Sequence, residues 1–431
     1  MSNSRDFDAV IVGASLAGSA AAIMLGRAGA RVALLEQRPD EKAYKRICSH
    51  YIQSSAMSTL ERLGLVEPMM QAGALRSRPR IHVPWGWIEP ARKSTVPAGI
   101  NLRRELLDPL IRSAAAETPG VELMLGQTVH ELVHEDGSVC GVRARDTSGT
   151  ELTLRSRLVV GADGRGSRVA KLAGVRERRH RHERFAYGTY YEGPPPDGSP
   201  DASLWLLDPD MAAAFPTDNG LTFYAVMPVK SRLERFRKAP AEALAEYVAG
   251  IPDAPPIRES EPVGPPEGKI DMTNVAHDPT APGLALVGDA ALAIDPLWGV
   301  GCGWALQSAQ WLADGVSDAL AEPDSQRGDS ALESGLKRYR RKHARALSGH
   351  ARMIYDYAGG RNLQPPERLL FSAATYDPGV ARVMEAYGSR NIGPARMMAS
   401  AMPRALAAHL RHGLGGRAHG ASSSAVPLAG Q

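Results

Sequence analysis

The chain begins with a strand, a glycine-containing turn and a helix in immediate succession. The stretch "AVIVG" is a continuous apolar run, as in a buried parallel strand, and "SAAAIMLGRAG" continues with small and apolar residues at helical spacing. Between them, Gly13-Ala14-Ser15-Leu16-Ala17-Gly18 keeps the first and last glycines of a phosphate-binding turn. This order predicts an α/β fold built on a parallel sheet.

The middle glycine of that turn is replaced by Ser15. The first glycine allows the tight turn and the last lets helix and strand pack closely, so Gly13 and Gly18 retain these two roles. Serine is tolerated in the middle if its φ is negative, and its hydroxyl can donate to a phosphate. "RVALLEQRP" predicts a second strand ending at Glu36, which suits a ribose hydroxyl. The alternative is a helix packed on a strand without any ligand.

Composition narrows the class of protein. The 431 residues are 43% hydrophobic and 23% charged, as in a globular protein, and a net charge of +4 spread along the chain argues against nucleic acid as a partner. Three distant cysteines, Cys48, Cys140 and Cys302, show no metal-ligand spacing, so we expect no metal and a reducing, cytoplasmic location. Neither a signal segment nor a transmembrane segment is expected.

The order of predicted elements indicates discontinuous domains. Aromatic, strand-like runs such as "FAYGTYYEG" and "LTFYAVMPV" interrupt the nucleotide-binding pattern, and the buried run "GLALVGDA" then returns to it. We expect a nucleotide-binding domain over 1–77, 100–175 and 276–326, and a substrate-binding sheet domain over 78–99 and 176–275. A helical region should follow over 327–413, and residues 414–431 have the composition of a disordered tail.

Two later motifs support a nucleotide site. In "RLVVGADGRGSRVAKLAGV" a strand ends at Gly161, turns through Asp163-Gly164 and leads into a helix near Ser167; a hairpin would be followed by an alternating strand instead. In "GLALVGDAALAIDPLWGVGCGWALQSAQWLAD" a strand leads through Asp289 into a helix.

With three motifs in this order, over roughly residues 7–325, the sequence resembles the para-hydroxybenzoate hydroxylase-like (group A) FAD-dependent monooxygenases. The resemblance implies an FAD-binding Rossmann-like domain with an inserted β-sheet substrate domain and a mainly helical C-terminal region. It implies FAD as cofactor, with these binding residues: Gly13, Ser15, Leu16, Ala17 and Gly18 for the pyrophosphate; Glu36 for the ribose; Gln37, Arg46, Arg104 (with Arg103 in reserve), Val129, Asp163, Gly164 and Asp289; and Pro296, Gly299, Val300 and Gly301 at the flavin.

A helix beginning near Gly299–Gly301 would direct its partial positive charge at the flavin and stabilise the anionic reduced ring. The sequence departs from the family where Leu292 follows "GDAA", where Val300 separates the two glycines, and where Gln307 or Ser308 stands in place of an aspartate. With these departures we still expect the protein to bind FAD, but the identity of the substrate stays open.

By this resemblance, NADPH or NADH, or a separate flavin reductase, reduces FAD, and a flavin C4a-hydroperoxide formed with O2 hydroxylates or epoxidises a substrate. His50 and Tyr51 are candidate catalytic residues, or else a structural histidine and a packed tyrosine. Large aromatic side chains suggest a large apolar or aromatic, natural-product substrate, as in antibiotic biosynthesis; the candidate lining residues are Trp85, Trp87, Trp205, Phe215, Phe223 and Trp298.

Three other functions stay open. A geranylgeranyl-reductase-like enzyme would use FAD as a hydride donor and would not need oxygen. A flavin-dependent halogenase is suggested by "PWGWIEP", although its tryptophans are one position out of register with the halogenase signature. A non-catalytic FAD-binding protein is the third.

Overall fold

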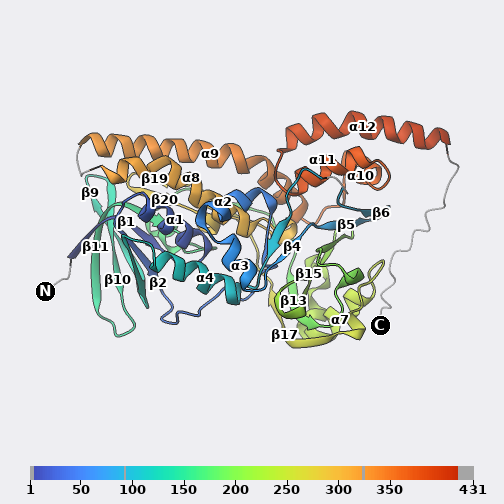
Figure 1. Ribbon diagram of the computed structural model, residues 1–431, viewed down its shortest axis with the longest axis horizontal. Helices are drawn as coiled ribbons and strands as arrows, with labels where there is room; N and C mark the ends of the chain where they lie inside the picture. The colour runs from blue at the N-terminus through green and yellow to red at the C-terminus, as the bar shows by residue number, and fades with distance from the viewer. Residues whose placement is uncertain (1–3, 92–93, 323–325, 416–431) are drawn as a thin grey trace. The chain divides into compact units, whose positions relative to one another are not determined.

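The computed structural model describes residues 4–91, 94–322 and 326–415, which form two compact units (Figure 1). Unit 1 comprises Met1–Leu75, Ala98–His182 and Asp271–Gly359. Unit 2 comprises Arg76–Pro97, Glu183–Ile270 and Gly360–Gln431. Each unit has its own large sheet and its own apolar core.

The central sheet of unit 1 has the order β19-β20-β11-β1-β2-β8, and β10 and β9 extend it from β11. β1, β2, β8, β11 and β20 run parallel to one another, whereas β19, β10 and β9 pair in the antiparallel sense. The parallel sheet predicted from the opening motif is therefore confirmed. Its strands are β1 (Ser4–Val12), β2 (Val32–Glu36), β8 (Val121–Leu125), β9 (Thr128–Glu135), β10 (Ser138–Arg145), β11 (Glu151–Gly161), β19 (Thr280–Ala281) and β20 (Leu284–Leu286).

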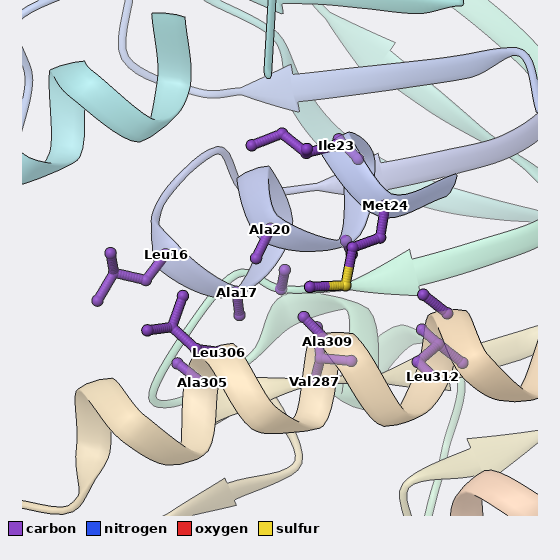
Figure 2. Packing of buried hydrophobic residues seen from close by; sticks show 14 of the residues in the cluster. Leu16, Ala17, Ala20, Ile23, Met24, Val287, Ala305, Leu306, Ala309 and Leu312 are labelled. Atoms are coloured by element: carbon purple, nitrogen blue, oxygen red, sulfur yellow. The ribbon is translucent and has the colours of Figure 1, made fainter. Parts of the chain in front are cut away.

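Two helices pack against each other in the core of unit 1 (Figure 2). α1 (Leu16–Arg27) follows β1, and α8 (Gly301–Ala321) follows the motif that contains Asp289. Their contact is made largely by small side chains, which allow close approach; Ala17, Ala20, Ala305 and Ala309 lie in it, with Leu16 and Leu306 near the N-terminal ends of both helices. The two N-termini therefore lie near each other.

Further elements surround this core. β3 pairs with β7, and β12, β18 and β21 form a small sheet. These elements have the following bounds: β3 (Tyr51–Ile52), η1 (Ser54–Ala56), α2 (Met57–Leu63), α3 (Val66–Gln71), β4 (Leu75–Ser77), β7 (Gly99–Asn101), α4 (Arg104–Ala116), α5 (Arg168–Leu172), β12 (Glu177–His180), β18 (Asn274–His277), η6 (Gly288–Ala290), β21 (Leu292–Ala293), η7 (Pro296–Trp298) and α9 (Gln326–Ala358).

Unit 2 is built on a seven-stranded sheet of order β17-β13-β16-β15-β14-β5-β6. The aromatic runs predicted as strands lie in β13, β14 and β16, so this second sheet is confirmed. The bounds are β5 (Arg80–Val83), β6 (Gly86–Ile88), β13 (Ala186–Glu192), η2 (Pro196–Gly198), β14 (Ser203–Leu206), β15 (Met211–Pro216), η3 (Asp218–Gly220), β16 (Leu221–Met227), η4 (Lys230–Arg232), α6 (Leu233–Lys238), α7 (Pro240–Ala249), η5 (Ile257–Glu259), β17 (Glu261–Lys269), α10 (Pro365–Ala374), α11 (Pro378–Gly388) and α12 (Pro394–Gly415).

The helices of the C-terminal region are divided between the units: α9 belongs to unit 1, and α10, α11 and α12 to unit 2. α9 packs along α8 where Gly315 and Gly335 let the two backbones meet. The functional domain boundaries expected from the sequence stay predictions, and most of the predicted tail, residues 416–431, lies outside the described residues. In the described ranges, no helix has the length and apolar character needed to cross a membrane.

Candidate FAD site

The turn between β1 and α1 requires its two glycines. Gly13 has a φ of 105°, and a Cβ there would lie 2.6 Å from the carbonyl oxygen of Ala162. A Cβ on Gly18 would overlap the carbonyl oxygen of Gly13. Ser15 precedes α1 with a φ of −100°, so the condition for a serine in the middle of the turn is met. Its side chain makes no cap bond to the helix and faces other partners.

Glu36 ends β2 beside this turn and is buried. Its Oε2 accepts a hydrogen bond from the backbone nitrogen of Ala14 at 3.1 Å, and its Oε1 accepts one from that of Arg38 at 3.1 Å. Gln37 is exposed. The carboxylate therefore lies at the carboxyl edge of the parallel strands, where the sequence predicts ribose binding.

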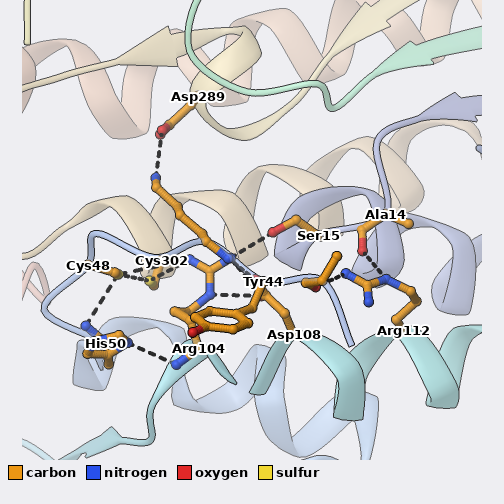
Figure 3. Close-up of polar contacts among 12 residues, drawn as sticks. Ala14, Ser15, Tyr44, Cys48, His50, Arg104, Asp108, Arg112, Asp289 and Cys302 are labelled. Atoms are coloured by element: carbon orange, nitrogen blue, oxygen red, sulfur yellow. Dashed lines mark hydrogen bonds and ion pairs between the residues drawn. The ribbon is translucent and has the colours of Figure 1, made fainter. Parts of the chain in front are cut away.

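Arg104 links the turn to α4 (Figure 3). Its side chain is 3% exposed; its Nε donates to Asp108 Oδ1 at 2.8 Å and its Nη2 to Ser15 Oγ at 2.7 Å. Although burial opposes the charge, Asp108 raises the pKa of Arg104, which therefore stays cationic. Arg103 instead pairs with the exposed Glu105. Arg104 therefore contacts the turn directly through Ser15.

Lys45 crosses from the segment after β2 to Asp289, with Nζ 3.3 Å from Oδ2 (Figure 3). Burial opposes ionisation of Asp289, but the charge of Lys45 holds the pKa of that carboxyl below its usual value. Asp289 in turn raises the pKa of Lys45. The sequence analysis names Arg46 for FAD and not its neighbour Lys45, because nothing in the local pattern distinguishes two adjacent basic residues; both are exposed, and the assignment of Arg46 stays a prediction.

Two cysteines meet at this site, which sequence analysis did not foresee. Cys48 follows Lys45, Cys302 is the second residue of α8, and their Sγ atoms lie 3.6 Å apart. Nη1 of Arg104 lies 3.9 Å from Cys48 Sγ and 3.8 Å from Cys302 Sγ. They are separated by 254 positions, so no local spacing could have paired them.

The candidate catalytic residues His50 and Tyr51 are both buried. The Nδ1 of His50 accepts a hydrogen bond from the backbone nitrogen of Arg104 at 2.9 Å, which leaves the ring proton on Nε2. Tyr51 lies in β3, and its Cδ1 would lie 3.7 Å from a Cβ on Gly299. The catalytic assignment of both residues stays a prediction.

The side chain of Asp163 forms hydrogen bonds within its own turn. Its carboxylate accepts hydrogen bonds from Ser167 Oγ at 2.5 Å, from the backbone nitrogen of Arg168 at 2.7 Å and from that of Val169 at 3.0 Å. These hydrogen bonds fix the start of α5. The neighbouring Gly164 has a φ of 79°, and a Cβ added to it would meet no described atom within 4 Å. The carbonyl oxygen of Val129 accepts from Nη1 of Arg168 at 3.3 Å, which connects β9 to this turn.

The segment Pro296–Gly301 leads into α8. Pro296 is exposed and Val300 is buried, whereas Gly299 has a φ of 59°. Gly301 is exposed, and no described atom lies within 4 Å of where its Cβ would be. A flat ring can therefore approach the backbone amides at this helix start.

The six aromatic residues expected to line a substrate pocket do not share one face. Trp205 and Trp87 belong to the core of unit 2 beneath α7, with ring centroids 5.5 Å apart. Phe215 and Phe223 pair across β15 and β16 on the opposite face of the sheet, as strand alternation requires. Trp85 is 36% exposed beside Arg368, and Trp298 lies in η7 of unit 1. The pocket itself stays a prediction.

Comparison with known proteins identifies the family. A family model described as an FAD binding domain matches residues 6–348. The chain belongs to the para-hydroxybenzoate hydroxylase-like FAD-binding family. The resemblance proposed from the three motifs is therefore confirmed, and with it the fold class and the assignment as an FAD-dependent oxidoreductase.

Relatives in this family differ in reaction. The chain is 27% identical over 348 residues to digeranylgeranylglycerophospholipid reductase 1 of Methanococcoides burtonii (78% of this chain, 79% of the relative). It is 28% identical over 362 residues to kynurenine 3-monooxygenase of Salinispora arenicola (78% and 77%). The solved structure of the flavin-dependent brominase Bmp2 superposes with a TM-score of 0.72 at 18% identity, covering 96% of this chain and 100% of that one, which shows a shared fold.

The residues of unit 1 fit FAD. The glycine turn, Glu36 and the start of α8 offer backbone amides, a carboxylate and an open helix end in the places that the pyrophosphate, ribose and flavin require. Arg104 supplies a positive charge beside the turn. The individual FAD contacts remain proposals.

Proposed function

We propose that this protein is a cytoplasmic FAD-dependent monooxygenase that hydroxylates or epoxidises a large apolar or aromatic natural product, with NADPH or NADH as the electron donor. The observation that carries the proposal is the open start of α8 at Gly301, with the buried cation Arg104 nearby. The match to kynurenine 3-monooxygenase supports oxygen transfer as the reaction.

Bound FAD would supply the redox chemistry, accepting two electrons from a nicotinamide and, when reduced, reacting with O2. The backbone amides at the start of α8 would stabilise negative charge on the flavin, because they present the positive end of the helix dipole. Arg104 would add a fixed cation, since Asp108 keeps it oriented. Gly13 and Gly18 would hold the pyrophosphate turn close to α1.

Substrate binding is assigned to unit 2, where the buried side chains of Phe215 and Phe223 lie on the sheet face opposite to α7. Because His50 Nδ1 holds the amide of Arg104, we assign His50 to positioning the start of α4, with Tyr51 shaping the wall beside Gly299.

A second candidate is a reductase of prenyl double bonds. It is favoured by the match to a digeranylgeranylglycerophospholipid reductase, at an identity close to that of the monooxygenase relative. A halogenase has less support, because Trp87 of "PWGWIEP" packs in the core of unit 2 and donates to Asp253 at 2.8 Å.

Isotope labelling separates the candidates. FAD-loaded protein would be incubated with NADPH or NADH and ¹⁸O2, using kynurenine, other aromatic compounds and a geranylgeranyl lipid as probes. We expect one ¹⁸O atom in a product that forms only with oxygen. A product with two added hydrogens, formed under anaerobic conditions, would instead establish the reductase. If only added flavin reductase supports turnover, the nicotinamide is not a direct donor.

A further inference from the structure

Cys48 and Cys302 form a close pair that the proposed FAD chemistry does not use. Their Sγ atoms are 3.6 Å apart, so a thiol of one can donate to the sulfur of the other. Cys302 is 6% exposed, whereas Cys48 is half-buried and therefore accessible to a small reagent. One member of the pair is accessible and the other is shielded.

A backbone N–H donor and a guanidinium lie beside the pair. The backbone nitrogen of His50 donates to Cys48 Sγ at 3.2 Å, and Nη1 of Arg104 lies within 3.9 Å of both sulfurs. Cys302 also lies in the first turn of α8, where the helix dipole favours negative charge. The surroundings stabilise one negative charge shared by the two sulfurs.

The two thiols differ in acidity. The hydrogen bond from Cys302 is the main cause that lowers the pKa of Cys48 well below that of a free thiol; burial opposes this, and the positive charges of Arg104 and Lys45 reinforce it. The same hydrogen bond, with burial, raises the pKa of Cys302. A thiolate at Cys48 beside a thiol at Cys302 is the arrangement of an attacking and a resolving cysteine.

We propose that Cys48 and Cys302 are a peroxide-reactive dithiol that closes to an intramolecular disulfide. The proposal rests on the sulfur separation, the accessible Cys48 and the adjacent guanidinium of Arg104, and it requires neither bound flavin nor the proposed oxygen transfer.

The oxidant is hydrogen peroxide, and the reaction balances in two steps. The thiolate of Cys48 attacks one oxygen of the peroxide; an S–O bond forms, the O–O bond breaks, and hydroxide leaves. The Cys302 sulfur then attacks the sulfenic sulfur of Cys48; an S–S bond forms, the S–O bond breaks, and the oxygen leaves as water with the Cys302 proton. The two sulfurs lose two electrons in total, and the peroxide gains them.

Cys140 provides an internal control. It lies in β10 and is half-buried, and burial raises the pKa of its thiol. Because a protonated thiol reacts slowly with peroxide, Cys140 should remain reduced while the pair is oxidised.

The test counts thiols in the full-length protein, which is first reduced, freed of reductant and then treated with hydrogen peroxide. Free thiols are titrated after denaturation, and non-reduced peptides are examined by mass spectrometry. We expect the count to fall from three to one, with a peptide pair joining Cys48 to Cys302, at a rate at least tenfold above oxidation of Cys140. Retention of three thiols, disulfides between chains, or equal oxidation of Cys140 would overturn the proposal.

Single variants test the order of the steps. Cys302→Ser should leave a sulfenic acid at Cys48 that dimedone traps, whereas Cys48→Ser should lose its peroxide sensitivity. Cys140→Ser is the matched control and should still lose two thiols. Dimedone labelling of Cys302 in place of Cys48 would refute the assigned roles.

Discussion

His182 and Asp295 are paired in the interior of unit 1, with Nε2 2.6 Å from Oδ2 and side chains 1% and 0% exposed. Oδ1 of Asp295 also accepts a hydrogen bond from the backbone nitrogen of Leu297 at 2.7 Å, at the start of η7. The backbone nitrogen of Asp295 donates to Asn274 Oδ1 at 2.6 Å. This network anchors the segment that leads through Gly299 into α8.

Replacing Asp295 by alanine should therefore destabilise unit 1 and loosen the proposed flavin site. Leaving a buried donor without its acceptor costs about 1–3 kcal/mol, and both His182 and the amide of Leu297 would lose an acceptor. Urea unfolding should show the loss of stability, and flavin titration should show weaker FAD binding.

Asp314→Ala is the control, because Asp314 lies on α8 in an exposed pair with Arg62. An exposed pair contributes less than about 1 kcal/mol, so this variant should unfold close to the wild type. If Asp295→Ala and Asp314→Ala lost the same free energy of unfolding, Asp295 would not have the structural role assigned to it.

Replacing glycine by alanine should affect protein stability at Gly18 and FAD affinity at Gly301. Gly18→Ala should destabilise the protein, because its Cβ would overlap the carbonyl oxygen of Gly13. In Gly301→Ala the added Cβ meets no described atom within 4 Å, so the apoprotein should fold with unchanged stability. The same Cβ would occupy the space through which the flavin is proposed to approach, so FAD affinity should fall about tenfold. Apoprotein unfolding and FAD titration measure the two effects separately.

Gly303→Ala is the matched control on the same helix. Its Cβ would lie 3.5 Å from Cβ of Ala56, an ordinary contact inside the protein. We expect unchanged FAD affinity. If Gly301→Ala binds FAD as tightly as Gly303→Ala, the flavin does not approach the start of α8.

Local pattern was sufficient to predict the elements around the glycine turn. A buried apolar run, two glycines and small residues at helical spacing specify β1, the turn and α1, since each glycine is required by a contact close in the chain or across the sheet. Ser15 has the negative φ that a serine needs in order to replace the middle glycine.

Long-range pairing was not predictable in this way. Lys45 and Asp289 are 244 positions apart, and neither has a local signal that names the other. The aromatic residues of unit 2 illustrate a second limit: a strand pattern shows that alternate residues share a face, but it does not show which face a helix covers. Trp205 is therefore found in the core with α7, and Phe223 on the opposite face.

Arg104→Lys should weaken FAD binding although the charge is retained. A lysine has no planar fork, so it cannot donate to Asp108 and Ser15 together as Arg104 does. We expect a loss of about 1–3 kcal/mol in unfolding free energy and a lower FAD affinity, measured by urea unfolding and flavin fluorescence. Arg62→Lys is the control, because Arg62 lies in the exposed pair with Asp314, and it should leave both quantities nearly unchanged. If Arg104→Lys keeps the wild-type stability and FAD affinity, as the control does, the forked contacts of Arg104 are not required.

His343 should make folding stability depend on pH. It lies in α9 with 7% exposure, and burial lowers its pKa from 6.5 to about 4. Below pH 6.5 the unfolded chain takes up a proton that the folded chain resists, so stability falls as the pH is lowered and stops falling near pH 4. The difference between the two pKa values corresponds to a loss of about 3 kcal/mol in the free energy of unfolding as the pH falls from 6.5 to about 4.

The measurement is the free energy of unfolding between pH 7 and pH 4 for the wild type and His343→Leu. Leucine has no proton to bind, so the variant should lose about 3 kcal/mol less than the wild type across this range. His134→Leu is the control, because His134 is exposed on β9, and its pH dependence should follow that of the wild type. Parallel curves for the wild type and His343→Leu would mean that His343 is protonated within the folded protein, and that α9 opens to admit water.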